Sequence, residues 1–216
     1  MNIFNERLFF FFLMIGATFL QAQNDGNATY SVEFDFGLSR TLHYHRPISV
    51  TQCYEACIPL EQKARKAYNA NLSIYRNLSA SNSIKLGLGW SEYRFWERGK
   101  ASPGDTSLLP YETTRAISYY DISVGYRHTF KKMAHLYPFV ETEMMLELPV
   151  DRSFAVNPYG IANKTRVGLL VPASGKWDVV FDAFYKTGII NYSSLSFTDA
   201  YIPYGYGIQI GLNRSI

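Results

Sequence analysis

Large apolar side chains alternate with small or polar ones along eight segments of the chain, and this pattern constrains the fold more than any other feature. In the last segment, YGYGIQIGLN, every even position from Tyr204 to Leu212 is large and apolar. A period of two is the period of a β-strand, whose successive side chains point to opposite faces. Each segment therefore predicts a strand with one oily face and one face of glycine, polar or charged residues.

The segments have a length and a number that suit a membrane barrel. A tilted strand needs about 9 to 11 residues to cross a bilayer, and the segments are close to that length. Their even number lets an antiparallel sheet close on itself. They are residues 30–39, 67–75, 84–91, 116–130, 136–148, 165–171, 177–186 and 204–212, with Leu170, Val180 and Phe184 breaking the alternation. We predict a closed eight-stranded antiparallel up-and-down transmembrane β-barrel, an all-β fold.

The connections between the segments support this prediction because long and short ones alternate. The long connections are residues 45–64, 99–112, 149–162 and 193–203, and the short ones are residues 77–82, 131–135 and 172–176. Transmembrane barrels make tight turns on the periplasmic side and longer loops outside, which is the same rhythm. A soluble lipocalin-like barrel is the alternative fold, in which the apolar faces would turn inward and leave Glu141, Glu143 and Arg166 in water.

The N-terminus predicts export. Residues 1–22 have a polar start with Arg7, an apolar run that ends at Leu20, and a small residue at Ala22. This pattern is typical of a cleavable signal peptide, so we expect the barrel domain over residues 23–216. Leu20 is a large residue at the minus-three position, where signal peptides have a small one, so the sequence does not fix the cleavage site. No later run offers 18 consecutive apolar residues, so no helical membrane anchor is expected.

The composition agrees with a β-strand protein that lies at an interface with water. Aromatic residues make up 16% of the chain and charged residues only 18%, which is low for a soluble domain. Tyr30, Tyr126, Phe130, Tyr137 and Trp177 fall near the short connections. A second set falls toward the long ones, namely Trp90, Trp96, Tyr120, Tyr185 and Tyr204. We expect two interfacial aromatic girdles. The net charge of +3 is small and dispersed, so no nucleic-acid partner is expected.

On its signal peptide, alternation and loop rhythm, the chain resembles the small eight-stranded outer-membrane β-barrels, the OmpA/OmpX-like transmembrane domain family of Gram-negative bacteria. The resemblance covers nearly all of the mature chain and rests on architecture, without a family-specific motif. It implies the fold and an integral location in the outer membrane, and it carries over no functional residue. The end at Arg214, Ser215 and Ile216 departs from the terminal aromatic that many such barrels use as an assembly signal.

Charged residues of both signs occupy the face that a transmembrane barrel turns inward. Because an unpaired charge in a poorly hydrated interior is costly, we expect them to pair across strands. We expect Glu143 and Glu147 beside Lys164 and Arg166, and the acids near the periplasmic end beside Lys85 and Arg127. The predicted network is Glu33, Asp35, Lys85, Asp121, Arg127, Glu141, Glu143, Glu147, Lys164, Arg166, Asp178, Asp182 and Lys186. Its main interpretation is a salt-bridged plug that shuts the lumen. A selective ion or proton path is the alternative, and an active-site pair of carboxylates is the least favoured one.

The first long connection contains the two cysteines of the chain. Cys53 and Cys57 are four residues apart, and in an oxidising compartment we expect them to form a disulfide. Two free thiols remain an alternative. A metal site built from both cysteines with His43 and His45 is a further one, but HxH followed by CxxxC is a weak metal signal. We expect no metal ion and no cofactor.

Catalytic motifs are missing from the sequence. It contains no GxSxG, GxxxxGK[ST] or HExxH. His128 falls on the lipid-facing register, whereas Ser123 and Thr129 fall on the inward one, which opposes a catalytic triad. We predict a non-enzymatic outer-membrane barrel with a structural or surface-interaction role. A narrow ion or small-solute channel is the alternative, and a lipid-modifying barrel enzyme is a less favoured one.

The long connections are the expected contact sites for partners. Loops on a rigid scaffold commonly carry recognition, so an extracellular ligand or envelope protein is one candidate. Basic residues in or near these connections, namely Arg94, Arg98, Lys100 and Arg115, could instead hold anionic headgroups of outer-membrane lipid. The sequence leaves these two kinds of partner open.

Overall fold

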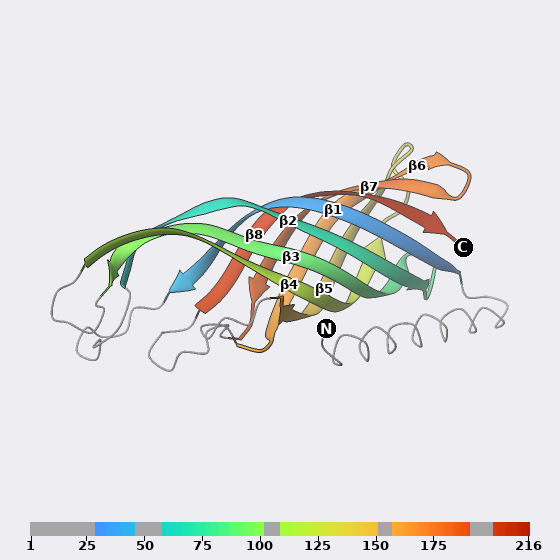
Figure 1. Cartoon of the computed structure of the whole chain (residues 1–216). Coiled ribbons are helices and arrows are strands. Elements are labelled where there is room, and N and C mark those ends of the chain that lie inside the picture. Colours follow the sequence, from blue (N-terminus) through green and yellow to red (C-terminus); the bar gives the residue numbers. More distant parts are fainter. Residues whose placement is uncertain (1–28, 46–57, 102–108, 151–156, 191–200) are drawn as a thin grey trace.

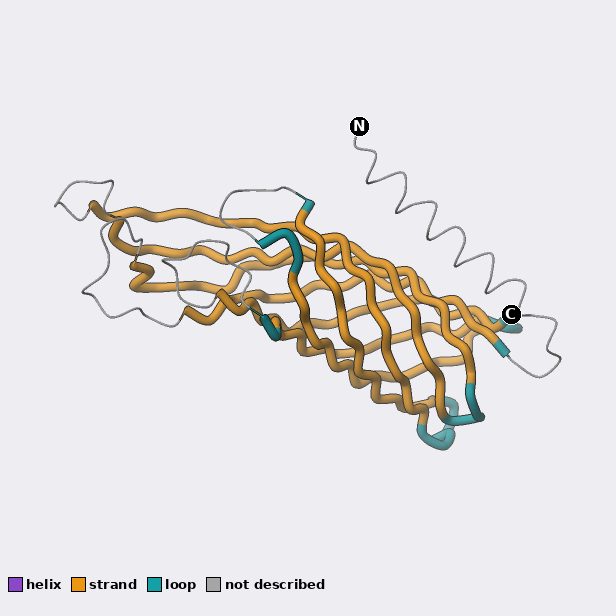
Figure 2. The backbone as a smooth tube through the Cα atoms, turned by 90° about the horizontal axis from the view of Figure 1, so that it is seen from below, coloured by secondary structure: helices purple, strands orange, loops and turns teal. Residues whose placement is uncertain are grey.

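The structure is a closed barrel of eight antiparallel strands, in which each strand pairs with its neighbour in sequence and β8 returns to β1 (Figures 1 and 2). The computed structural model describes residues 29–45, 58–101, 109–150, 157–190 and 201–216. The strands are β1 (Tyr30–His45), β2 (Ile58–Asn77), β3 (Asn82–Ala101), β4 (Leu109–Thr129), β5 (Tyr137–Pro149), β6 (Gly160–Ser174), β7 (Trp177–Gly188) and β8 (Tyr201–Ser215). The predicted eight-stranded barrel is confirmed. No described segment forms a helix long and apolar enough to span a membrane.

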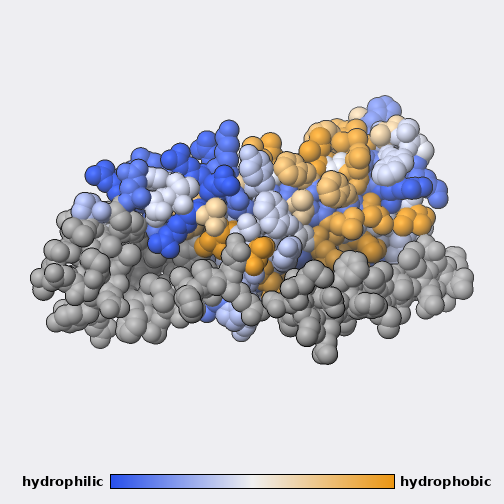
Figure 3. All heavy atoms as spheres, in the orientation of Figure 1, coloured by the Kyte–Doolittle hydropathy of each residue, from blue (hydrophilic) through white to orange (hydrophobic). Residues whose placement is uncertain are grey.

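The two faces of the strands lie as the alternation predicts. Phe34, Val124 and Ile208 point outward and are 55%, 61% and 66% exposed, whereas Glu33 and Arg166 point inward and are fully buried. On the face shown in Figure 3, large apolar residues gather over one part of the barrel, and polar residues gather toward both ends. The lipocalin-like alternative is therefore wrong, because it requires the apolar faces to share the interior.

Three strands continue well past the apolar belt, by which we mean the part of the barrel whose exterior carries exposed apolar side chains such as Phe34, Val124 and Ile208. β2, β3 and β4 have 20, 20 and 21 residues, about twice what a bilayer requires. We call residues 58–66, 92–101 and 109–118 of these strands the outer extension. β4 pairs with β5 only from Tyr119 onward, so its first part pairs with β3 alone.

The predicted long connections are consequently too long. Residues 58–64, 99–101, 109–112, 160–162 and 201–203 lie in strands rather than in loops. Outside the bilayer neither face of a strand must be apolar, so a ladder can continue without the strict alternation that marks its membrane part. Residues 1–28, which include the predicted signal peptide, and Cys53 and Cys57 lie outside the described residues.

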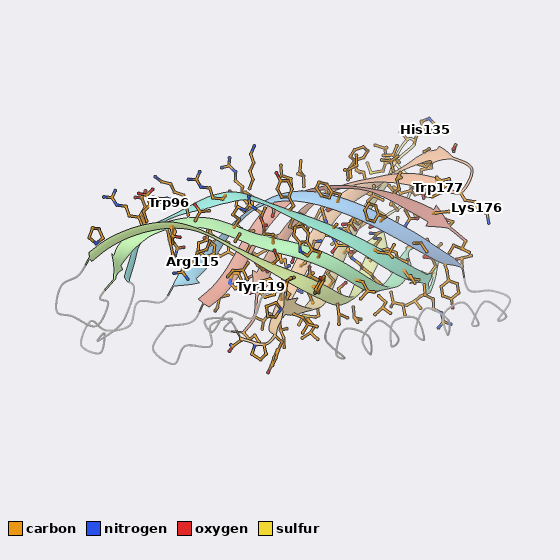
Figure 4. The ribbon with its side chains drawn as sticks, viewed as in Figure 1. Trp96, Arg115, Tyr119, His135, Lys176 and Trp177 are labelled. Atoms are coloured by element: carbon orange, nitrogen blue, oxygen red, sulfur yellow. The ribbon has the colours of Figure 1, made fainter. Side chains whose placement is uncertain are left out.

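The short connections form tight turns at the opposite end of the barrel. Leu78 N donates a hydrogen bond to Asn82 O at 2.8 Å, and Met133 and Leu136 bridge the β4–β5 turn. Gly175 closes the β6–β7 turn with φ of 59°, a left-handed conformation that glycine adopts without strain. His135, Lys176 and Trp177 lie at this end, and Trp96 and Arg115 lie on the outer extension (Figure 4).

The aromatic girdles are partly as expected. Tyr126, Phe130 and Trp177 are exposed near the short turns. Tyr30 has the outward register of Phe34, but only 5% of its surface is exposed. Trp96 lies on the outer extension, beyond the expected girdle, where its Nε1 donates to Glu112 Oε1 at 2.9 Å.

Candidate functional site

The lumen contains a buried cluster of charges centred on Arg166 of β6. Arg166 Nη2 lies 2.6 Å from Asp182 Oδ2 and 3.1 Å from Glu33 Oε1, and Nη1 lies 3.0 Å from Glu141 Oε1. Asp35 Oδ2 is slightly farther, at 3.7 Å from Nη1. These acids come from β7, β1 and β5, because inward positions of different strands converge on the narrow interior. One guanidinium therefore ties together strands on opposite parts of the barrel wall.

Arg127 of β4 forms a second centre beside the first. It contacts Glu33 at 2.8 Å and Glu141 at 2.7 Å, so both acids are shared with Arg166. Its Nη2 donates to the Tyr75 hydroxyl at 2.6 Å, and its guanidinium lies 4.1 Å from the centre of the Tyr75 ring. Phe139 lies near the guanidinium as well, at 4.3 Å. Charge-assisted hydrogen bonds and cation–π contacts compensate the desolvation of this buried group.

Lys85 of β3 completes this inner layer. Its Nζ lies 2.9 Å from Glu141 Oε1 and 2.7 Å from Glu143 Oε2. Lys164 is the next base along the lumen, 3.5 Å from Glu143 Oε1. Glu141 thus contacts three bases, two arginines and a lysine. The layer is buried, and Arg127 lies at its edge beside the open mouth near the short turns.

A second, smaller cluster lies toward the outer extension. Lys186 Nζ is 2.5 Å from Glu147 Oε1 and 3.8 Å from Asp121 Oδ2, and it donates to Ser91 Oγ at 2.9 Å. The Tyr93 hydroxyl donates to Glu147, with both carboxylate oxygens at 3.1 Å. This cluster lies beside a small cavity of about 20 Å³, which is room for about one water molecule.

Inward glycines make room for these long side chains. A Cβ added to Gly37 would lie 2.5 Å from Asn69 Oδ1 and 2.7 Å from Gln209 Cγ. Gln209 in turn donates to Asp35 Oδ1 at 2.6 Å and to Asn69 Oδ1 at 2.6 Å. Gly37 of β1 thus leaves room for Gln209, which lies on the inward face of the last strand.

The structure brings together most of the residues that the sequence predicts for the lumen. Arg127 contacts Glu33, as expected. Glu147 pairs with Lys186 rather than with Lys164 or Arg166, since it lies opposite Gly160 in the β5–β6 ladder. Asp178 is the exception: it lies half-buried at the open mouth near the short turns and forms no ion pair among the described residues.

Several residues that complete the site escaped the sequence analysis. Tyr75 and Tyr93 occupy inward positions and were recognisable by register alone, but their hydroxyl partners lie on strands distant in sequence. Two further ion pairs lie on the outer extension, Arg94 with Glu92 at 2.9 Å and Arg115 with Glu97 at 2.6 Å. Both pairs lie outside the eight alternating segments, so the alternation does not mark them.

The charged side chains of the described lumen contact mainly one another, and His128 lies apart from them. Seven buried acids face five buried bases in the described lumen, and Asp121 has no hydrogen-bond partner on either oxygen. His128 Nδ1 lies 2.8 Å from Asn82 Oδ1, and its ring packs against Phe130. This histidine therefore contacts an amide and an aromatic ring rather than a nucleophile.

Comparisons with known proteins agree on the fold. No protein-family model and no curated protein matches the sequence. The crystal structure of Neisserial surface protein A aligns over 87% of this chain and 98% of its own, with TM-score 0.50 and 11% identity. The solid-state NMR structure of outer membrane protein AlkL in DMPC lipid bilayers covers 88% of this chain and 90% of its own, with TM-score 0.52 and 13% identity. The chain has the fold of the eight-stranded outer-membrane β-barrels.

Proposed function

We propose that this outer-membrane β-barrel is a non-conducting, non-enzymatic anchor that presents its outer extension and outer connections at the cell surface. The observation that carries the proposal is the buried layer around Arg166, Arg127 and Lys85, in which every base contacts at least two carboxylates. An eight-stranded barrel has an interior just wide enough for side chains to fill. A layer of this kind across it blocks the passage of hydrated ions.

The outer extension supplies the surface for recognition. It places three paired strands beyond the apolar belt, with exposed basic side chains and the half-buried Trp96 on a rigid ladder. Recognition residues on a rigid scaffold need little ordering on binding, which favours affinity. The partner in this proposal is an extracellular ligand or an envelope protein that contacts these strands or the connections between them.

Single-channel recording in planar bilayers tests the proposal. We expect the wild-type protein to give no defined conductance steps. A variant that replaces two acids and two bases of the plug, Glu33→Ser/Arg127→Ser/Glu141→Ser/Arg166→Ser, should give steps because it empties the layer without changing the net charge. Arg98→Ser on the outer extension is the control and should be silent. Defined, ion-selective steps from the wild-type protein would contradict the anchor and support the narrow channel.

A further inference from the structure

Three basic side chains gather on the exterior of the barrel where the apolar belt meets the outer extension. Arg40 lies on β1, and Arg65 and Lys66 lie on β2; all three are exposed. We call them the basic cluster. Arg40 lies directly opposite Lys66 in the β1–β2 ladder, and Arg65 is the next residue along β2. Like charges that face each other on adjacent strands repel, so this pairing is unfavourable without a counter-charge.

Neighbouring cations on the same side of the molecule have their counter-charges within the chain. Lys63 pairs with Glu61 at 2.9 Å, and Arg94 pairs with Glu92 at 2.9 Å. By contrast, no member of the basic cluster forms an ion pair with any residue that the structure describes. The cluster therefore presents uncompensated positive charge.

A bulge in β2 contributes one of the three cations. The ladder with β3 shifts register between Ala64 and Asn69. In a regular strand, consecutive residues point to opposite faces, but here Arg65 and Lys66 are both exposed and Ala67 is fully buried. Bulges re-aim side chains in this way. The irregularity keeps both charges on the exterior.

The surface beside the cluster is apolar and aromatic. Three exposed side chains lie at adjoining positions of strands β1 and β2. They are Phe36, Leu38 and Tyr68, which are 46%, 37% and 39% exposed. The rings of Phe36 and Tyr68 stack with centroids 6.1 Å apart. Tyr206 lies opposite Arg40 on β8 and is 52% exposed. A ligand at the cluster would thus meet cations at one end and hydrocarbon-facing side chains at the other.

We propose that the basic cluster binds the phosphate group of an outer-leaflet lipid whose acyl chains lie along Phe36, Leu38 and Tyr68. Guanidinium groups bind phosphate through parallel hydrogen bonds, and a lysine adds a point charge. Adjacent strands are about 4.8 Å apart, so side chains from β1 and β2 can reach one phosphate. This site goes beyond the proposed anchoring function and does not depend on whether the lumen conducts.

Isothermal titration of the folded, full-length protein in neutral detergent micelles tests the site. The probes are a phosphatidic acid, a diacylglycerol with the same chains, and inorganic phosphate. The test variant is Arg40→Gln/Arg65→Gln/Lys66→Gln. The matched control is Arg98→Gln/Lys131→Gln/Lys176→Gln, which removes three exposed cations elsewhere on the molecule. Unlike the residues of the basic cluster, Arg98 lies opposite two acids in its ladders, Glu61 and Glu112. Heat-modifiable migration on gels verifies that each variant is folded.

We expect wild type and control to bind phosphatidic acid equally, and the test variant to bind it about 100-fold more weakly, at about fivefold per basic residue. Diacylglycerol should bind none of the three proteins measurably. Equal loss in the test and control variants would overturn the site, because general charge attraction would then explain binding. Inorganic phosphate that binds as tightly as phosphatidic acid would overturn the lipid as the ligand.

Discussion

At the scale of single residues, Arg166 has the largest number of partners in the lumen. Four carboxylates lie within ion-pair distance of its guanidinium, and they come from β1, β5 and β7. Removal of one partner from a buried network leaves the others charged and uncompensated, which costs more than the net value of the pairs. The stability of the barrel should therefore depend more on this arginine than on any exposed cation.

Arg166→Ala tests this dependence. We expect the substitution to lower the free energy of unfolding by about 3–5 kcal/mol, the range for breaking a buried ion pair. Urea titration of the protein folded in lipid vesicles, followed by tryptophan fluorescence, measures the change. Arg98→Ala on the exposed face of the outer extension is the control and should change it by less than about 0.5 kcal/mol. Similar values for both variants would contradict the structural role of the buried network.

At the scale of single elements, β4 lies in two environments along its length. Val124 is 61% exposed on the apolar belt, whereas Thr114 is exposed ten positions earlier on the same face of the strand, on the outer extension. The register with β3 continues through both positions, as Leu86 pairs with Val124 and Trp96 pairs with Thr114. One strand thus crosses from hydrocarbon to water without a break in its ladder.

A pair of arginine substitutions on β4 separates the two environments. Val124→Arg should destabilise the barrel by about 2–4 kcal/mol, the cost of a basic side chain on the lipid face near the midplane. Thr114→Arg should cost almost nothing because its side chain is in water. Equilibrium unfolding in vesicles measures both. A large cost at Thr114 would show that the extension is embedded in the bilayer.

At the scale of the whole molecule, closure of the barrel separates two ends with different chemistry. The end with the short turns has Lys176 exposed between β6 and β7, and the opposite end continues into the outer extension (Figures 1 and 4). Arg98 is exposed on this extension. Eight-stranded outer-membrane barrels place short turns in the periplasm and longer segments outside. The anchor that we propose requires this orientation.

Cysteine labelling of intact cells tests the orientation. In a Cys53→Ser/Cys57→Ser background, Arg98→Cys should react with a membrane-impermeant maleimide on intact cells. Lys176→Cys should react only after the outer membrane is permeabilised. Lysed cells provide the control that both thiols are reactive. The reverse order of labelling would place the outer extension in the periplasm and rule out surface presentation.

Alternation by itself determined the number of strands, their two faces and most of the charged side chains in the lumen. A bilayer imposes this pattern because every lipid-facing position must be apolar and every second position points away from the lipid. Where the lipid ends, the constraint ends too. For this reason the sequence placed residues 58–64 and 109–112 in loops, although they continue the strands.

Only the tertiary structure decided which acid meets which base. Arg166 and Glu33 are 133 positions apart in the chain, and they meet because β8 closes the sheet against β1 and the strands tilt around a narrow axis. The same closure sets Lys186 against Glu147 and leaves Asp178 at the mouth. The face of the strand on which a residue lies is a local property and can be read from a period of two. Contact across the lumen depends on the shear and radius of the closed sheet, which no local pattern encodes.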